Sequence, residues 1–265
     1  RTRGTRTRMA RYRSSQGLLY EGRRLRALLA QGCTVTKEES SKATIFHVVS
    51  GLASEEMLKR AERGFRLLPF VYVCSASDLP GDGLPGNSLL QEKTERAALG
   101  APNSVFVSHS WHDSRHDKWE ALRRWAAERQ KDKGVTPLLW FDAACVAQDD
   151  VQASLAFLPL FTSGCQHFLM LVGETYTRRL WTVIELFCFL RMGGSVNRVI
   201  VLPVGDNMSG DAARAQFERF DVKYARCAKD EDTQRLLACI EAGFGAHGPF
   251  NEMVRRILLN KQLWY

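Results

Sequence analysis

From Ser104 onward, short continuous apolar runs of the chain alternate with longer segments whose apolar residues have helical spacing. Short apolar runs without polar alternation are typical of parallel strands that are covered on both faces. We expect strands near residues 104–108, 138–141, 167–172 and 198–203, and helices over 114–130, 151–158, 178–192, 211–220, 233–243 and 249–260. The pattern predicts an α/β fold, with helices on both faces of a doubly wound parallel sheet.

The first part of the chain has a different organisation. The pattern predicts a helix that begins after Ser54 and ends at Pro69, followed by a strand over 70–74. Pro, Gly, Ser and Asp dominate residues 75–88 and predict a linker, and a short helix over 89–99 leads into the second part. We therefore divide the chain into a basic disordered arm at 1–26, an α/β N-terminal extension of unknown type at 27–88 with its linker at 75–88, and a domain at 89–265 with its core at 104–205 and C-terminal helices.

The net charge of +8 is concentrated at one end of the chain. Residues 1–26 hold nine Arg and one Glu, which accounts for the whole excess, so the remaining residues are neutral as a set. Nucleic acid or an anionic membrane would therefore bind only through this arm, by electrostatic attraction. A disordered linker is the alternative interpretation of the same composition.

The seven Cys form no C-x-x-C pair, and several lie inside apolar runs such as "LFCFL". An odd number of Cys in apolar surroundings is typical of reduced, buried thiols and not of a disulfide framework. The cysteines therefore favour a cytoplasmic protein.

Polar and ionisable side chains follow the expected strands at their carboxyl ends. The strand near 104–108 runs into "SHSWHD", the strand near 167–172 runs into "GETYTRR", and the strand near 138–141 ends at Asp142. Ligands of doubly wound sheets bind at this edge, where the strand order reverses. In the flavodoxin-like order 2-1-3-4-5 that we expect, the reversal lies between strands one and three. The first two polar segments should therefore meet there.

Glu185 is the only acid in the apolar segment "LWTVIELFCFLRM", and no base lies three or four residues from it. A buried carboxylate is costly unless it is paired or lines a cleft. We expect Glu185 to face a cleft bounded by the loops after Ser108 and Gly173. A partner elsewhere in the fold, or a helix that turns Glu185 outward, is the alternative.

These segments resemble a Toll/interleukin-1 receptor (TIR) domain, in a divergent form. Such domains often have a first strand that ends near a Ser, a third strand that leads to a Tyr and a Trp-Cys-x-x-Glu-Leu helix, and a fourth strand with an apolar-Pro-apolar run. The corresponding residues here are Ser108, Tyr176, Trp181, Glu185, Leu186 and the run "VIVLPV". The resemblance covers residues 104–205.

Two positions depart from the family pattern. Thr182 stands where the Cys after the Trp is usual, and the loop after strand two, "DAACVAQDDVQASL", lacks the Gly of many members. The second departure puts assembly through this loop in doubt. Residues 27–88 resemble no family.

The resemblance implies one of two functions in intracellular signalling, a role that TIR domains have in innate immunity. Some TIR domains cleave NAD+ between ribose and nicotinamide, in which case Glu185 would be catalytic and NAD+ a substrate, with no cofactor. The expected substrate-binding residues are then Ser108, His109, Ser110, Trp111, Asp142, Tyr176 and Trp181, with Trp111 or Trp140 stacking on a ring. Other TIR domains only assemble with themselves or with other TIR-like domains, and the sequence leaves this alternative open.

Two further chemistries have weaker support in the sequence. His109, His112 and His116 have a spacing that could serve zinc, but His109 ends a strand and His116 begins a helix. We therefore assign no metal site. Cys145 lies in a loop where it could approach a His, but no activating base is near it in the sequence, so a nucleophilic role is not favoured.

Overall fold

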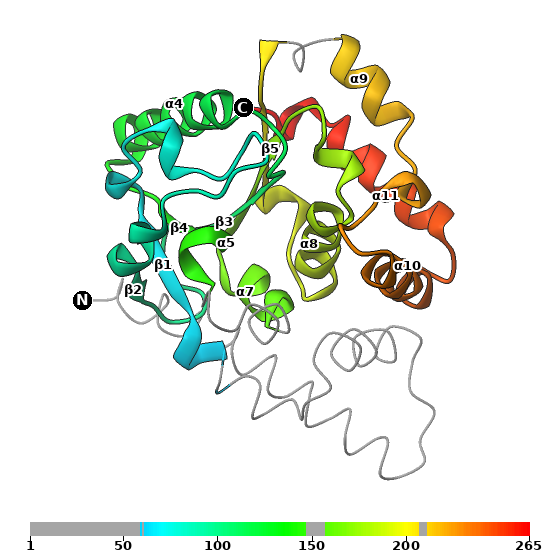
Figure 1. Ribbon diagram of the computed structural model, residues 1–265, viewed down its shortest axis with the longest axis horizontal. Helices are drawn as coiled ribbons and strands as arrows, with labels where there is room; N and C mark the ends of the chain where they lie inside the picture. The colour runs from blue at the N-terminus through cyan, green and yellow to red at the C-terminus, as the bar shows by residue number, and fades with distance from the viewer. Residues whose placement is uncertain (1–58, 60, 147–156, 207–210) are drawn as a thin grey trace, which may run out of the picture.

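The computed structural model describes residues 59, 61–146, 157–206 and 211–265 (Figure 1). The basic arm at 1–26, residues 27–58 of the extension and residues 151–156 of an expected helix lie outside these ranges. Within the described ranges the chain is an α/β protein with one mixed sheet of six strands.

Four neighbouring strands of the sheet are parallel to one another. They are β3 (Ser104–His109), β4 (Leu138–Trp140), β5 (His167–Val172) and β6 (Val199–Pro203). β3 lies between β4 and β5, and β6 pairs with the other edge of β5. The apolar runs thus predicted these four strands and their parallel pairing correctly, because each strand is covered on both faces and needs a continuous apolar run.

The complete order, β2-β1-β4-β3-β5-β6, differs from the order 2-1-3-4-5 that the sequence led us to expect. No fifth parallel strand follows β6 in the described residues, where only an isolated bridge joins Val201 to Trp264. The sheet instead grows at its other edge. There β1 (Arg66–Pro69) pairs antiparallel with β4, and β2 (Glu95–Arg96) pairs antiparallel with β1.

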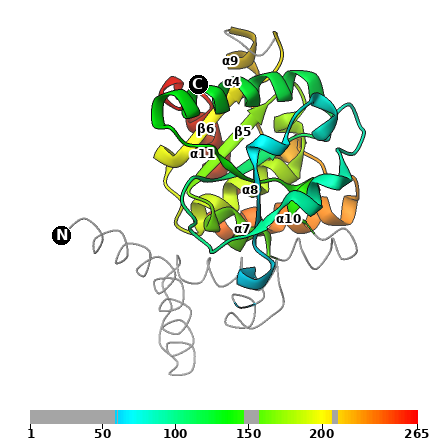
Figure 2. The same cartoon turned by 90° about the vertical axis from the view of Figure 1, so that its left-hand side faces the viewer.

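Helices lie on both faces of the sheet (Figure 2). α4 (Arg115–Lys133) begins after the side-chain cap of Ser114 and ends at Gly134, whose φ of 62° suits a residue without a side chain. α7 (Leu158–Gly164) and α8 (Leu180–Arg191) lie on the opposite face, and α8 also packs on α10 (Asp230–Phe244). The remaining helices are α5 (Asp142–Cys145), α9 (Asp211–Glu218) and α11 (His247–Leu258).

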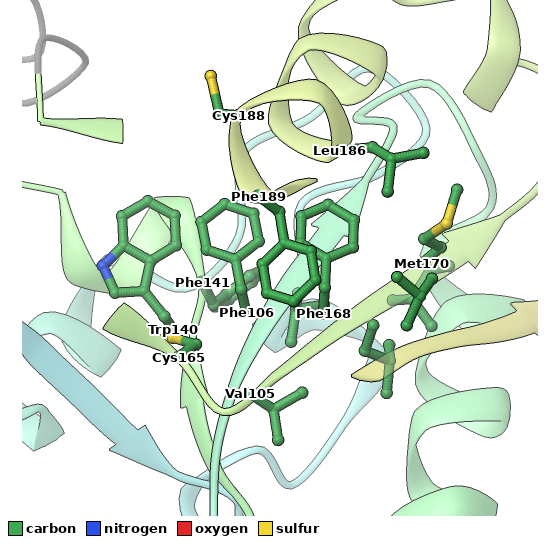
Figure 3. Packing of buried hydrophobic residues seen from close by; sticks show 14 of the residues in the cluster. Val105, Phe106, Trp140, Phe141, Cys165, Phe168, Met170, Leu186, Cys188 and Phe189 are labelled. Atoms are coloured by element: carbon green, nitrogen blue, oxygen red, sulfur yellow. The ribbon is translucent and has the colours of Figure 1, made fainter. Parts of the chain in front are cut away.

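The core is built from aromatic rings on the central strands (Figure 3). The ring of Phe106 stacks on Trp140 and on Phe168, with centroid distances of 4.6 and 5.3 Å. Phe168 in turn contacts Phe189 of α8 at 5.2 Å. Successive side chains of a strand point to opposite faces, so these contacts assign Phe168 to the α8 face and its neighbours His167 and Leu169 to the α4 face.

Three predictions about the region before Ser104 are wrong. The helix expected to reach Pro69 ends earlier, because Leu67 and Leu68 are buried in β1 and pair with neighbouring strands. The expected strand at 70–74 begins as a 3-10 turn at Phe70–Tyr72, where Val71 and Tyr72 stay exposed. The expected helix at 89–99 is a 3-10 helix, Ser88–Lys93, followed by β2. In each case the presence or absence of pairing with a neighbouring strand outweighs the helix or strand propensity of the residues themselves.

Residues 75–88, predicted to be a linker, pack against the body of the protein. Asp78, Leu79 and Pro80 are buried, and a short 3-10 helix over Ala76–Asp78 lies against α4. The Asp82 and Gly83 amides donate to the carbonyls of Asp113 and Trp111. The Pro and Gly residues thus shape an ordered turn that covers the loop after β3, and we call residues 78–84 the strap.

No helix among the described residues has the length and apolar content needed to cross a bilayer. Cys145, Cys165, Cys188, Cys227 and Cys239 are buried and Cys74 is exposed, and all six are free thiols. The prediction of buried, unpaired cysteines is thus confirmed for these five.

Candidate functional site

Polar groups meet at the carboxyl ends of β3, β4 and β5. β3 ends at His109 and continues into the loop 110–114, β4 leads to Asp142, and β5 leads to residues 173–177. Because these three parallel strands are neighbours in the sheet, their carboxyl ends lie side by side. We call this edge, with Glu185 from α8, the carboxyl-end site.

Glu185 contacts the centre of this edge through Ser108. The Ser108 hydroxyl donates to Glu185 Oε2 at 2.5 Å, and it lies 2.7 Å from the Tyr176 hydroxyl. Since a Ser hydroxyl has one proton, Tyr176 is then the donor to Ser108. The structure thus joins three of the predicted site residues in one series of hydrogen bonds, from Tyr176 to Ser108 to Glu185. Ser108 is therefore the tertiary partner of Glu185. The cleft that we expect around Glu185 stays a prediction.

Glu185 is half-buried as a residue, but protein atoms surround its carboxyl group. Burial raises the pKa of Glu185 well above the usual range of a Glu, the hydrogen bond from Ser108 opposes this, and the negative charge of Asp142 adds to it. Burial likewise raises the pKa of Tyr176. A carboxyl group with a raised pKa at the ligand-binding edge of a sheet is a typical feature of functional sites.

A second cluster joins His109, Trp111 and Asp142. His109 Nε2 lies 3.1 Å from Asp142 Oδ1, and the Trp111 indole N–H donates to Asp142 Oδ2 at 2.8 Å. Burial would raise the pKa of Asp142, but the charge and hydrogen bonds of its neighbours outweigh burial, so its pKa is lowered. The Asp142 side chain is 34% exposed, so water screens part of this interaction. Asp142 thereby fixes the Trp111 indole, which is 37% exposed.

Lys118 is a site residue that our sequence analysis missed. It is fully buried, and its ammonium group donates to Pro80 O at 2.5 Å and Ser110 O at 2.6 Å and lies 3.5 Å from His109 Nδ1. Burial lowers the pKa of Lys118 to about 8, against the charges of Asp113, Asp142 and Asp82.

The sequence did contain a signal for Lys118. It precedes Leu122 and Trp125 by four and seven residues, so it occupies the apolar face of its helix. A Lys on such a face must find acceptors inside the fold. Those acceptors are backbone carbonyls of the strap and of the loop after β3, whose proximity no local pattern predicts.

Ser110 and Asp113 connect the loop after β3 to the loop after β5. Ser110 Oγ lies 2.7 Å from Thr175 Oγ1, and Asp113 Oδ1 accepts from the Thr175 amide and hydroxyl at 2.8 and 2.7 Å. Asp113 Oδ2 is buried without a partner. Gly173 leaves room for this carboxylate, because a Cβ there would lie 2.4 Å from the Asp113 carboxyl carbon.

The other predicted residues have structural roles. Trp140 is buried in the aromatic core, so it cannot stack on a ligand, and Trp181 is half-buried against the same core. Cys145 is buried, donates weakly to Leu139 O and has a pKa raised to about 12 by burial, which makes it a poor nucleophile. In the described part of the chain, no three His, Cys, Asp or Glu side chains are placed to hold a metal ion.

The fold and the site together define an α/β protein with a desolvated carboxyl group at the carboxyl ends of its parallel strands. Comparisons of the chain with protein-family models, curated protein sequences and solved structures find no match. The TIR resemblance therefore rests on the motif residues alone. A function for this edge has to be argued from its chemistry.

Proposed function

We propose that the chain carries a TIR-like domain that cleaves NAD+ at the bond between the nicotinamide nitrogen and C1′ of the ribose. The observation that carries the proposal is the 2.5 Å contact of Glu185 with Ser108 at the carboxyl end of β3. This contact holds the Glu185 carboxyl group at the carboxyl ends of the parallel strands, where ligands of such folds bind.

A carboxylate suits this reaction. When the C1′–N bond breaks, its electron pair stays on the ring nitrogen and nicotinamide leaves as a neutral molecule. The ribose acquires oxocarbenium character, which a nearby carboxylate stabilises. Water then attacks C1′ and loses a proton, so the products are ADP-ribose, nicotinamide and H⁺. Attack by a group of the substrate itself would give a cyclic product in place of ADP-ribose.

The raised pKa of Glu185 is compatible with this role. Burial favours the protonated carboxyl group in the protein without substrate. The nicotinamide ring of NAD+ is positively charged, and a positive charge beside a carboxyl group favours its ionised form. Substrate binding would therefore help to generate the carboxylate that the reaction needs.

The second cluster would bind the rest of the substrate. Trp111 offers a partly exposed indole beside the site, and Asp142 and His109 fix its orientation through hydrogen bonds and contacts. Aromatic side chains held in this way stack on planar rings such as those of NAD+. Lys118 is occupied by protein acceptors, so we assign it a positioning role through His109.

The test is nicotinamide release from NAD+ by the full chain, both free and crowded on a vesicle surface. We expect activity in the parent and a loss on the order of 10²–10³-fold in Glu185→Gln, since the neutral amide keeps the shape but cannot stabilise the cation. Glu241→Gln is the matched control, because Glu241 is an exposed carboxylate on α10. A folded Glu185→Gln protein that cleaves NAD+ at the parent rate would refute the catalytic role.

A non-catalytic interaction module is the second candidate, and one observation favours it. The segment before the parallel strands exposes large apolar side chains, namely Val71 at 62%, Tyr72 at 40%, Leu84 at 55% and Leu89 at 64%. Large exposed apolar side chains can take part in binding another copy or a related domain. A parent protein that self-associates but releases no nicotinamide in either form would support this candidate.

A further inference from the structure

An unusual group of basic side chains lies at the amino end of β5. This is the end of the parallel strands opposite to the carboxyl ends, where Glu185 lies. His167 is the first residue of β5, and its side chain lies on the α4 face of the sheet. Arg129 and Lys133 lie one turn apart near the end of α4, which packs on this face. We call His167, Arg129 and Lys133 the amino-end cluster.

Arg129 is a buried cation with one hydrogen-bond donor, Nε, that is not used. The residue is only 9% exposed, and its Nε is buried without a partner. Its guanidinium carbon lies over the Trp125 ring, 5.2 Å from the ring centre. Among the described residues, no carboxylate forms an ion pair with it. A buried donor without an acceptor is costly.

His167 likewise has a buried polar atom that makes no hydrogen bond. Its Nδ1 is buried and has no partner. Burial, together with the positive charges of Arg129, Lys133 and Arg198, lowers the pKa of His167 to about 4. The charges of described residues that shift this pKa are thus all positive.

The acids nearest to the amino-end cluster do not neutralise it. Glu128 and Asp132 are exposed on α4 and face Tyr265, whose hydroxyl donates to Glu128. Arg198 approaches from the segment before β6, but it donates to the carbonyls of Gln166 and Gly193 and lies over the ring of Phe189. Arg198 thus affects His167 through the electrostatic effect of its positive charge and not through a hydrogen bond.

We propose that the amino-end cluster binds a phosphate group through Arg129, His167 and Lys133. A guanidinium group matches two phosphate oxygens, and its planar fork is favoured over other cations for this purpose. The buried Nδ1 of His167 would supply a third donor, and Lys133 would add charge at the exposed rim. Since this site lies at the opposite edge of the sheet, the inference does not depend on NAD+ cleavage.

Binding of phosphate should be visible at His167 itself. An anion favours the protonated imidazole, so the pKa of His167 should rise above about 4 when phosphate is bound. By linkage, phosphate should bind more tightly as the pH falls, about tenfold for each pH unit of that rise. Neither effect is expected if the cluster is only a set of solvated surface charges.

The experiment is an NMR titration of the full chain with labelled histidine, in which His167→Gln assigns the His167 signal. Inorganic phosphate, adenosine monophosphate and adenosine are added in separate arms. We expect saturable shifts at His167 with both phosphate-containing probes and none with adenosine. Tighter binding of the nucleotide than of inorganic phosphate would identify a phosphorylated metabolite as the source of the group.

Two variants make the result specific. Arg129→Met should weaken phosphate binding about tenfold or more, the loss expected for one buried charge-assisted contact. Lys131→Gln, which removes an exposed basic residue of the same helix, should leave the affinity unchanged. If Arg129→Met does not fold, Lys133→Gln replaces it, with a smaller expected loss. No saturable shift at His167, or equal affinities in the parent and the folded cluster variant, would overturn the proposal.

Discussion

Two cations are buried on the same face of α4 and differ in what surrounds them. Lys118 lies at the carboxyl end of the sheet, where its ammonium group contacts two carbonyl oxygens and an imidazole nitrogen. Arg129 lies about three turns further along the helix, where its Nε has no partner and its neighbours His167 and Lys133 are basic. The protein supplies hydrogen-bond acceptors to the Lys118 ammonium group but none to Arg129 Nε.

This difference separates a structural role for a buried charge from a binding role. The charge of Lys118 serves to connect the strap, the loop after β3 and His109, so the carboxyl-end site is organised before any ligand arrives. The Arg129 guanidinium lies over the Trp125 ring, but its Nε has no acceptor, so it connects no backbone segments in the way that Lys118 does. Burial of a charged group therefore does not by itself indicate a ligand, and the state of its hydrogen-bonding partners has to be considered.

The largest expected effect is on stability. Lys118→Met would leave the Pro80 carbonyl without a donor and the Ser110 carbonyl with only the 3.4 Å contact of the Asp113 amide, so we expect a loss of about 2–4 kcal/mol in the free energy of unfolding. Arg129→Met replaces an unpaired buried cation with an apolar side chain of similar length, so we expect a change within about 1 kcal/mol or a gain. Urea unfolding measures both. Equal losses in the two variants would remove the distinction between the two cations.

A smaller loss is expected at Gly173, which leaves room for Asp113. In Gly173→Ala the new methyl group would lie 2.4 Å from the Asp113 carboxyl carbon, so the contacts of Asp113 with Thr175 have to shift. We expect a loss of about 1–3 kcal/mol. Gly248→Ala is the control, because a Cβ at Gly248 meets nothing within 4 Å and helical Gly gains from the change. A Gly173→Ala protein as stable as this control would contradict the close packing of the two loops.

The smallest effect is the pH dependence of stability that Lys118 causes. Its pKa is lowered from 10.5 to about 8 on folding, so the unfolded chain binds the proton more tightly between these values. Stability from this group therefore rises with pH across that window, by at most about 1.4 kcal/mol per pH unit. The gain between pH 7.5 and 9.5 should be larger in the parent than in Lys118→Met, measured by urea unfolding. A smaller gain in the parent would show that Lys118 is not buried in its charged form.

The sequence predicted the central strands and helices because their signals are local. β3 and β5 are continuous apolar runs, and α4 has Ser114 as its cap and Gly134 as its end. The region before Ser104 was predicted poorly for the opposite reason. Its strand residues Leu67 and Leu68 are held by pairing with distant segments, and its Pro- and Gly-rich strap is ordered by contacts with α4.

The contrast between local signals and contacts of distant segments also applies to the carboxyl-end site. Glu185 could be predicted because it is the only acid in an apolar helix, and Ser108 because it lies at a strand end, whereas Tyr176 was expected from the TIR resemblance; the structure joins all three. The roles of Lys118 and Thr175 could not be predicted, because the contacts of Lys118 with Pro80 and of Thr175 with Asp113 join segments that are 38 and 62 residues apart. Trp140 was predicted as a possible stacking residue, but its place within β4 buries it in the core.

The most direct test of the central claim, that Glu185 supplies the carboxylate for NAD+ cleavage, is the pH dependence of nicotinamide release. For the parent, kcat/KM should rise with pH, with a midpoint above the usual pKa of a Glu, because burial raises the pKa of Glu185 in the free protein. In Glu185→Gln this rise should be absent and the rate low at every pH. A parent profile without this rise, or the same rise in folded Glu185→Gln, would contradict the account.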